Sequence, residues 1–202
     1  MNRKIKALGL TLMAALALTA VMASAASGNF TSSAAHTALH GLQGEQHKFT
    51  AGAGIGSITC ATGTFSGTLA GTSQPTLVIT PHYTNCKDGL GRTVHVNVVG
   101  SYEFTSTAGK GLVHMINGGI TVTVTGSTNC VITLTAQKSK NNVAYTQSGN
   151  NLEVKTTTNN IHSHISGGGF ACGTTSTTSS NGTYTGTTLL KGNGGEAKIS
   201  VH

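Results

Sequence analysis

Most of this chain alternates between apolar and polar residues with a period of two. The clearest segments are residues 93–98, 120–125, 131–135 and 161–165. A period of two with one apolar face is typical of half-buried antiparallel strands. No window of about a dozen residues after the first 25 shows the 3.6-residue period of a helix. The pattern therefore predicts an all-β protein.

Turn residues divide the alternating segments. Ser148-Gly149-Asn150-Asn151 separates residues 143–147 from 152–156, which predicts a hairpin, and Pro75 and Pro81 are expected to bound a short strand between them. About ten or eleven short strands with Gly and Asn turns are typical of an antiparallel β-sandwich, with a barrel as the alternative. We expect one such domain over residues 47–202.

The beginning of the chain has a different composition. A basic start with Arg3, Lys4 and Lys6 leads into an apolar run and then Ala23-Ser24-Ala25. This layout predicts a cleaved secretory signal peptide over residues 1–25 and a secreted or cell-surface protein. An uncleaved anchor is the alternative, although a run of about 17 apolar residues is at the lower limit for spanning a bilayer. No second apolar run follows, so we expect no membrane span after cleavage.

Residues 26–46 are rich in small side chains and show little periodicity. They are expected to form a flexible N-terminal arm that precedes the domain.

Four cysteines, an even number in an exported chain, predict disulfides. Three pairings are possible, and spacing alone does not decide among them. We favour Cys60–Cys86 with Cys130–Cys172, because sequential loops are the least entangled. A zinc site is the alternative, but the chain contains no Cys-x-x-Cys pair.

Ionisable groups are scarce, since only 8% of the residues are charged. Removing Arg3, Lys4 and Lys6 from the 12 basic residues leaves 9 against 5 acidic ones, and these 9 are scattered along the chain. A nucleic-acid surface needs clustered cations, so none is expected. Glu103 and Glu153 are the best candidates for a hydrolytic carboxylate pair, but strand carboxylates more often face solvent. We therefore expect that the protein has no catalytic residues, binds no cofactor and is not an enzyme.

Histidine is the one enriched titratable residue, with nine in the chain. His162 and His164 are two positions apart on an expected strand, so both side chains leave the same face and could bind a metal ion. The alternative is that surface histidines replace charged residues. The chain has no Trp and four Tyr, which argues mildly against a lectin. Tyr83 and Tyr184 are the better candidates for stacking on a sugar, although strand tyrosines are more often buried.

The exported leader, the four spaced cysteines and the segment Asn181-Gly182-Thr183-Tyr184-Thr185-Gly186 resemble uncharacterised secreted four-cysteine β-rich proteins of actinobacteria. The likeness covers roughly residues 55–190 and implies no site residues.

Together these features predict a secreted, non-catalytic structural or interaction protein whose partner is an extracellular protein or glycan. Two alternatives stay open: a module that binds glycan or cell wall, and a pilin-like subunit whose arm, residues 26–46, completes the sheet of a neighbour.

Overall fold

The computed structural model describes residues 27–52, 55–107, 110–125, 130–138, 140–167, 172 and 176–202. The expected signal peptide, residues 1–25, lies outside the described residues. Within them the chain is all-β, as expected, and its single helical turn is a 3₁₀ turn at Asn193–Gly195. No helix in these ranges is long and apolar enough to cross a membrane.

The strands differ greatly in length. They are β1 (Ser27–Gly28), β2 (Phe30–Ser32), β3 (Thr37–Gly52), β4 (Ile55–Leu69), β5 (Ser73–Gln74), β6 (Thr76–Asp88), β7 (Thr93–Val98), β8 (Ser101–Thr107), β9 (Lys110–Val124), β10 (Cys130–Lys138), β11 (Lys140–Ser148), β12 (Asn151–Ser166), β13 (Thr177–Gly192) and β14 (Ile199–Val201).

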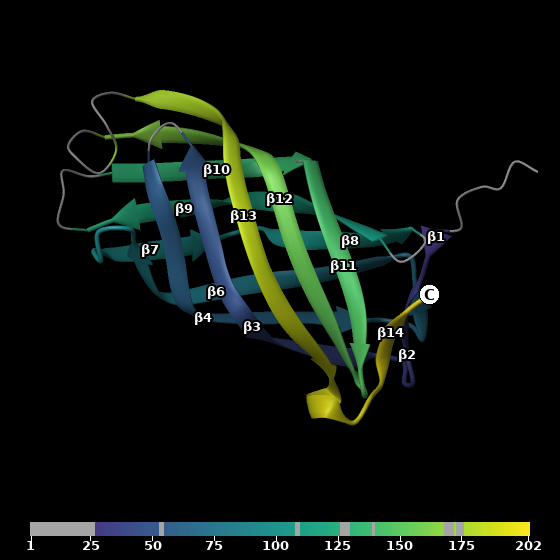
Figure 1. Ribbon diagram of the computed structural model, residues 1–202. Helices are drawn as coiled ribbons and strands as arrows, with labels where there is room; N and C mark the ends of the chain where they lie inside the picture. Colours follow the sequence, from purple (N-terminus) through teal and green to yellow (C-terminus); the bar gives the residue numbers. More distant parts are fainter. Residues whose placement is uncertain are drawn as a thin grey trace, which may run out of the picture.

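Eight of these strands close into an antiparallel barrel in the order β3-β4-β6-β8-β9-β10-β12-β13, and β13 pairs with β3 again. Two further strands pair with members of this ring. β7 pairs with both β6 and β9, and β11 pairs with both β9 and β12. The strands curve around a common interior (Figure 1). The architecture is therefore the barrel that the sequence left open as the alternative to a sandwich.

β-Bulges change which residues face the interior. Asn85, Asn117 and Asn160 have φ values of 52°, 55° and 57°, in the left-handed region. Before Asn160 the even-numbered residues of β12 are buried, and after it the odd-numbered ones are. An extra residue in one strand bends that strand and re-aims its side chains. The bulges thus let long strands follow the curvature of the barrel.

A second, three-stranded sheet of β14, β2 and β5 covers one end of the barrel (Figure 1). Its Phe30 and Ile199 are fully buried, and the Phe30 ring meets Tyr145 of β11 edge to face at 5.4 Å. Gln147 Nε2, next to the β11–β12 turn, donates to the carbonyl of Ile199. The small sheet is therefore part of the same core as the barrel.

The expectation of a flexible arm over residues 26–46 is wrong for the part of it that the structure describes. Residues 37–46 form the first part of β3, which pairs with β4 on one side and β13 on the other. Their inward positions include Thr37 and Gly41, which carry no hydrophobic signal, so the alternation is not visible in the sequence. Residues 39–42 are paired on both edges, so this part of the segment has no free edge to offer a neighbouring molecule.

Both expected disulfides are present, Cys60–Cys86 and Cys130–Cys172. Cys60 and Cys86 are direct partners on β4 and β6, and Cys130 opens β10. All four cysteines are buried near the end of the barrel opposite the small sheet. In the chain-entropy model, closing loops of 26 and 42 residues stabilises the fold by about 3–4 kcal/mol each.

Candidate functional site

A cavity with a volume of about 110 Å³ lies inside the barrel, between the capped end and the disulfide end. Apolar side chains form most of its wall. They come from β3, β4, β7, β8, β9, β10 and β12: Phe49, Ile58, Phe65, Val96, Phe104, Val113, Met115, Ile120, Val122, Leu134 and Ile161.

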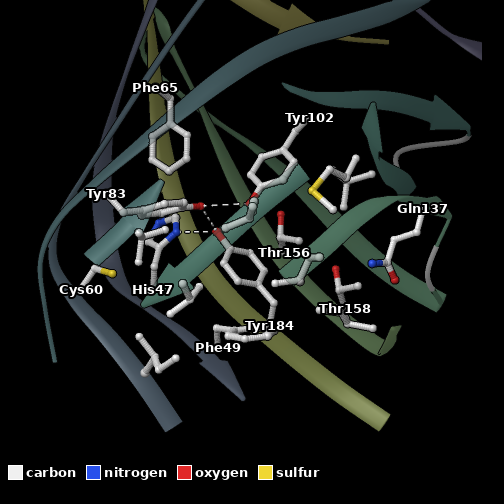
Figure 2. A pocket seen from close by; sticks show the side chains of 18 of the residues that line it. His47, Phe49, Cys60, Phe65, Tyr83, Tyr102, Gln137, Thr156, Thr158 and Tyr184 are labelled. Carbon is white, nitrogen blue, oxygen red and sulfur yellow. Dashed lines mark hydrogen bonds between the residues drawn. The ribbon is translucent and has the colours of Figure 1, made fainter. Parts of the chain in front are cut away.

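One side of the cavity is polar. His47 of β3, Tyr83 of β6, Tyr102 of β8 and Tyr184 of β13 converge there, and their polar atoms meet at one point (Figure 2). His47 Nδ1 lies 2.5 Å from Tyr184 Oη, which lies 3.0 Å from Tyr83 Oη; Tyr83 Oη lies 3.4 Å from Tyr102 Oη. Four strands far apart in the sequence thus build a continuous hydrogen-bonded chain.

His47 is anchored at the far end of this chain. Its Nε2 lies 3.1 Å from the backbone carbonyl oxygen of Thr187, which can only accept a hydrogen bond. Nε2 therefore carries the proton, and in the neutral ring Nδ1 is the acceptor. Burial lowers the pKa of His47, and the hydrogen bond to Thr187 opposes that effect. The neutral imidazole is the form that the interior favours.

The surrounding packing leaves His47 little freedom. Its ring centroid lies 5.2 Å from that of Phe65 and 5.8 Å from that of Tyr83. On β13, Gly186 lies against the imidazole, where an added Cβ would come within 2.7 Å of Nδ1. A glycine is therefore required at this position for the close approach of strand and ring.

Outside the barrel, Thr187 makes a second connection. Its hydroxyl donates to Glu45 Oε2 over 2.7 Å, and Lys155 Nζ lies 3.1 Å from the same oxygen. The hydrogen bond from Thr187, followed by the contacts with Lys155, lowers the pKa of Glu45. Thr187 therefore links His47, through its carbonyl, to the outer carboxylate of Glu45, through its hydroxyl.

The tyrosines of the cluster keep their protons. Burial raises the pKa of Tyr102 to about 12, against a lowering effect of its hydrogen bond with Tyr83. Burial is also the main cause that raises the pKa values of Tyr83 and Tyr184 well above 10.0. Neutral phenol groups next to a neutral imidazole can exchange hydrogen bonds with a ligand, but they present no charge to it.

Three more polar side chains border the cavity, those of Thr156, Thr158 and Gln137 (Figure 2). The Gln137 amide is occupied by the backbone of His162: Nε2 donates to the carbonyl and Oε1 accepts from the N–H, both over 2.8 Å. This pair fastens β10 to β12 just after the bulge at Asn160. Gln137 therefore supports the wall of the cavity, and the threonine hydroxyls face its interior.

The metal-binding candidates His162 and His164 lie on the outside of the barrel. Both are exposed on β12, and His164 Nε2 lies 3.3 Å from Ser176 Oγ. The described residues include no group of three or more His, Cys, Asp or Glu side chains placed to hold a metal ion. The two histidines share a face, as expected, and metal binding by them stays a prediction.

The carboxylates Glu103 and Glu153 also point outward, since their neighbours Phe104 and Leu152 are buried. Strands β9 and β11 separate them around the ring, so they do not face each other across a cleft. The expectation that Tyr83 and Tyr184 are candidates for stacking on a sugar is wrong in placement, because both rings are inside the barrel.

Sequence reasoning missed His47 as a functional residue. His47 and Phe49 alternate with Lys48 at the start of the expected domain, and this inward pattern was the one available signal. Comparisons of the chain with protein-family models, with curated proteins and with solved structures found no match.

Proposed function

We propose that this chain is an exported, non-catalytic binding protein that holds a small, largely apolar molecule inside its barrel. The observation that carries the proposal is the cavity of about 110 Å³, with an apolar wall and one hydroxyl-rich side. Pockets that bind small molecules are commonly apolar with a few well-placed polar groups. Two disulfides and an export-like leader are consistent with an extracellular role.

The size of the cavity limits the ligand. An engineered apolar cavity of about 150 Å³ binds benzene. Scaled from that cavity, about 110 Å³ suits a molecule of about four or five non-hydrogen atoms, and a six-membered ring is the upper limit. A sugar or a peptide is too large for this space, so a glycan partner would need the outer surface, and that alternative stays a prediction.

The side chains at the cavity support binding rather than catalysis. No Asp, Glu, Lys or Arg is among the described residues that line it, and its Cys60 is held in a disulfide. His47 has its Nε2 bound to a carbonyl and its Nδ1 bound to a tyrosine. In this arrangement the lone pair of His47 Nδ1 is directed at the Tyr184 hydroxyl rather than at a ligand in the cavity.

Titration with benzene, followed by calorimetry and by the methyl NMR signals of Met115 and Val113, tests the proposal. We expect saturable binding and a ligand-dependent rise in melting temperature. Val122→Phe places a ring in the cavity and should abolish binding. Thr123→Phe, on the outward face of the same strand, is the matched control and should bind normally.

If the unmodified protein shows no saturable binding of benzene or of the similar-sized pyrrole and pyridine, the cavity is a packing void and the proposal fails. Equal binding by the Val122→Phe and Thr123→Phe variants would place the ligand elsewhere and would also contradict it.

A further inference from the structure

We propose that the hydrogen-bonded chain of the cavity has one direction and ends in a free acceptor, Tyr102 Oη. The cavity would then select neutral molecules that carry an O–H or N–H donor over molecules that only accept. This inference rests on the proposed function, since it specifies the ligand of the same cavity.

The direction is set where the chain meets the backbone. Because the carbonyl of Thr187 cannot donate, the proton of neutral His47 must sit on Nε2. Nδ1 then has a lone pair and no proton. The 2.5 Å contact between Nδ1 and Tyr184 Oη is therefore a hydrogen bond that Tyr184 donates.

Each hydroxyl has a single proton, so this assignment determines the next bonds. Tyr184 already donates its proton to His47, so it can only accept a hydrogen bond in its 3.0 Å contact with Tyr83. Tyr83 therefore donates to Tyr184. With that proton used, Tyr83 can only accept in its 3.4 Å contact with Tyr102, so Tyr102 is the donor there.

Tyr102 Oη is the open end of the chain. No described residue donates a hydrogen bond to it, and Tyr102 lines the cavity. Figure 2 shows its hydroxyl at the centre of the cluster, on the side of the cavity where Thr156 lies. A lone pair left without a donor in an apolar interior is costly, and a ligand with a donor group removes that cost.

A ligand that only accepts meets the opposite situation. To donate to it, Tyr102 must give up its bond with Tyr83, which leaves Tyr83 Oη without a donor. The hydroxyls of Thr156 and Thr158 can serve either type of ligand, so they reduce the difference without reversing it. The class of ligand that fits best is a small alcohol or a five-membered N–H heterocycle.

Pyrrole and pyridine test this directly, because pyrrole has an N–H donor and pyridine has only an acceptor nitrogen. Benzene is the reference for ring burial alone. One net hydrogen bond corresponds to about a fivefold change in dissociation constant. In the unmodified protein at neutral pH we expect pyrrole to bind about fivefold more tightly than pyridine, by calorimetry.

Two substitutions in the chain act through different ligands. Tyr83→Phe frees the Tyr102 proton, so pyridine should bind about fivefold more tightly while pyrrole is unchanged. Tyr102→Phe removes the acceptor, so pyrrole should bind about fivefold more weakly while pyridine is unchanged. Tyr145→Phe is the matched control: Tyr145 donates to the carbonyl of Thr105 and does not line the cavity, and its loss should alter neither ligand.

A tighter pyridine complex in Tyr83→Phe is decisive, because general damage to the cavity would weaken both ligands. Equal affinities for pyrrole and pyridine in the unmodified protein, or an unchanged ratio in both variants, would overturn the direction of the chain and leave binding itself intact. Failure of all three molecules to bind would overturn the proposed function and this inference together.

Discussion

The two halves of the barrel interior are filled differently. The capped half, beneath the sheet of β14, β2 and β5, contains aliphatic and aromatic side chains with almost no exposed surface: Phe30, Leu39, Leu69, Leu77, Leu152, Leu190 and Ile199. The cavity half contains the cluster of His47, Tyr83, Tyr102 and Tyr184 and the space beside it. One barrel thus combines a close-packed core with an incompletely packed one.

The difference has a physical cause. Branched aliphatic side chains interlock in many arrangements, so the capped half can fill its volume completely. The cluster in the cavity half must satisfy hydrogen-bond geometry as well, which fixes where its rings lie. Thr156 and Thr158, at inward positions of β12, are smaller than leucine or phenylalanine, so space remains next to the hydroxyls. The polar cluster and the cavity are therefore two results of the same requirement.

The largest expected effect occurs at alkaline pH, and most of it comes from the cavity half. All four tyrosines have a pKa raised by burial, and three of them form the cluster. The stability that comes from keeping them protonated is complete below about pH 10 and is lost as the pH rises toward the folded-state values. Each tyrosine removes up to about 1.4 kcal/mol per pH unit in that range.

We therefore expect no tyrosinate absorption from the folded protein just above pH 10, and its appearance together with unfolding at higher pH. The measurement is a pH titration that follows tyrosinate absorption and circular dichroism on the same sample. Tyrosinate that forms gradually while the β-sheet signal is unchanged would contradict the buried placement of these rings.

Matched leucine substitutions compare the packing of the halves. Leu39 is 1% exposed in the capped half, and Leu134 is 5% exposed and borders the cavity. Replacing a buried leucine by alanine costs about 2–5 kcal/mol, depending on how closely it is packed. Leu39→Ala should lie near the upper limit and Leu134→Ala near the lower one, because Leu134 has fewer neighbours to lose. Denaturant unfolding of both variants checks this; equal losses would mean that the halves are equally packed.

The disulfide Cys60–Cys86 belongs to the cavity half, since Cys60 lines the cavity. Replacing both cysteines by alanine should reduce the free energy of unfolding by about 3 kcal/mol. Hydrogen exchange should show that the loss of protection is concentrated in β4 and β6 near the missing bond. If the strands beneath the small sheet lost protection first, the disulfide would be stabilising the molecule as a whole rather than the cavity half.

Gly186→Ala tests how tightly β13 and His47 are fitted. An alanine Cβ would come within 2.7 Å of Nδ1, so the ring must move and its bond with Tyr184 must weaken. Overpacking of this kind costs about 1–3 kcal/mol. Gly44→Ala on β3 is the control, because a Cβ there makes only ordinary contacts, the nearest at 3.4 Å from Thr187. Similar stability of the two variants, by thermal unfolding, would show that His47 has room to move.

Sequence reasoning predicted the aliphatic strands and the two disulfides, but it missed the polar cluster and the part of the capped half that contains Phe30 and Leu39. The hairpin of β11 and β12 and the strands near residues 93–98 and 120–125 are present, because aliphatic residues alternate there without interruption. Strand β6 continues through Pro81, where we expected it to end. Its pairing with β8 stops at Ile79 and pairing with β7 starts at Cys86, so Pro81 lies where that side of β6 has no partner.

The cavity could not be predicted from the sequence for a different reason. Its hydrogen-bonded cluster comes from β3, β6, β8 and β13, and the closest members of this cluster are 19 positions apart in the sequence. Only closure of the ring brings them together, and alternation within a strand carries no information about closure. The inward face also shifts at the left-handed residues Asn85 and Asn160, so counting by twos from one end of a strand assigns the wrong residues to the interior.

The smallest expected effect is the acid sensitivity of His47. Burial lowers its pKa below 6.5, so the unfolded chain takes up a proton at this position before the folded protein does. The stabilisation is complete above about pH 7 and is lost as the pH falls through 6.5 toward the folded-state pKa, by at most about 1.4 kcal/mol per pH unit. The titration of Asp88 does not overlap with that of His47, because it occurs at lower pH. Burial raises the pKa of Asp88, but the stronger combined effect of hydrogen bonds from Arg92 and Leu90 lowers it below 3.8.

A series of denaturant titrations between pH 5 and pH 7 measures this slope for the unmodified protein, for His47→Gln and for His164→Gln. Removing His47 should flatten the slope, while removing the exposed His164 should leave it unchanged. If His47→Gln kept the full slope, the imidazole would accept a proton in the folded state as readily as in the unfolded chain. His47 would then not be held in the neutral form whose tautomer sets the direction of the hydrogen bonds among the tyrosines. The loss of stability below pH 7 therefore also tests that direction.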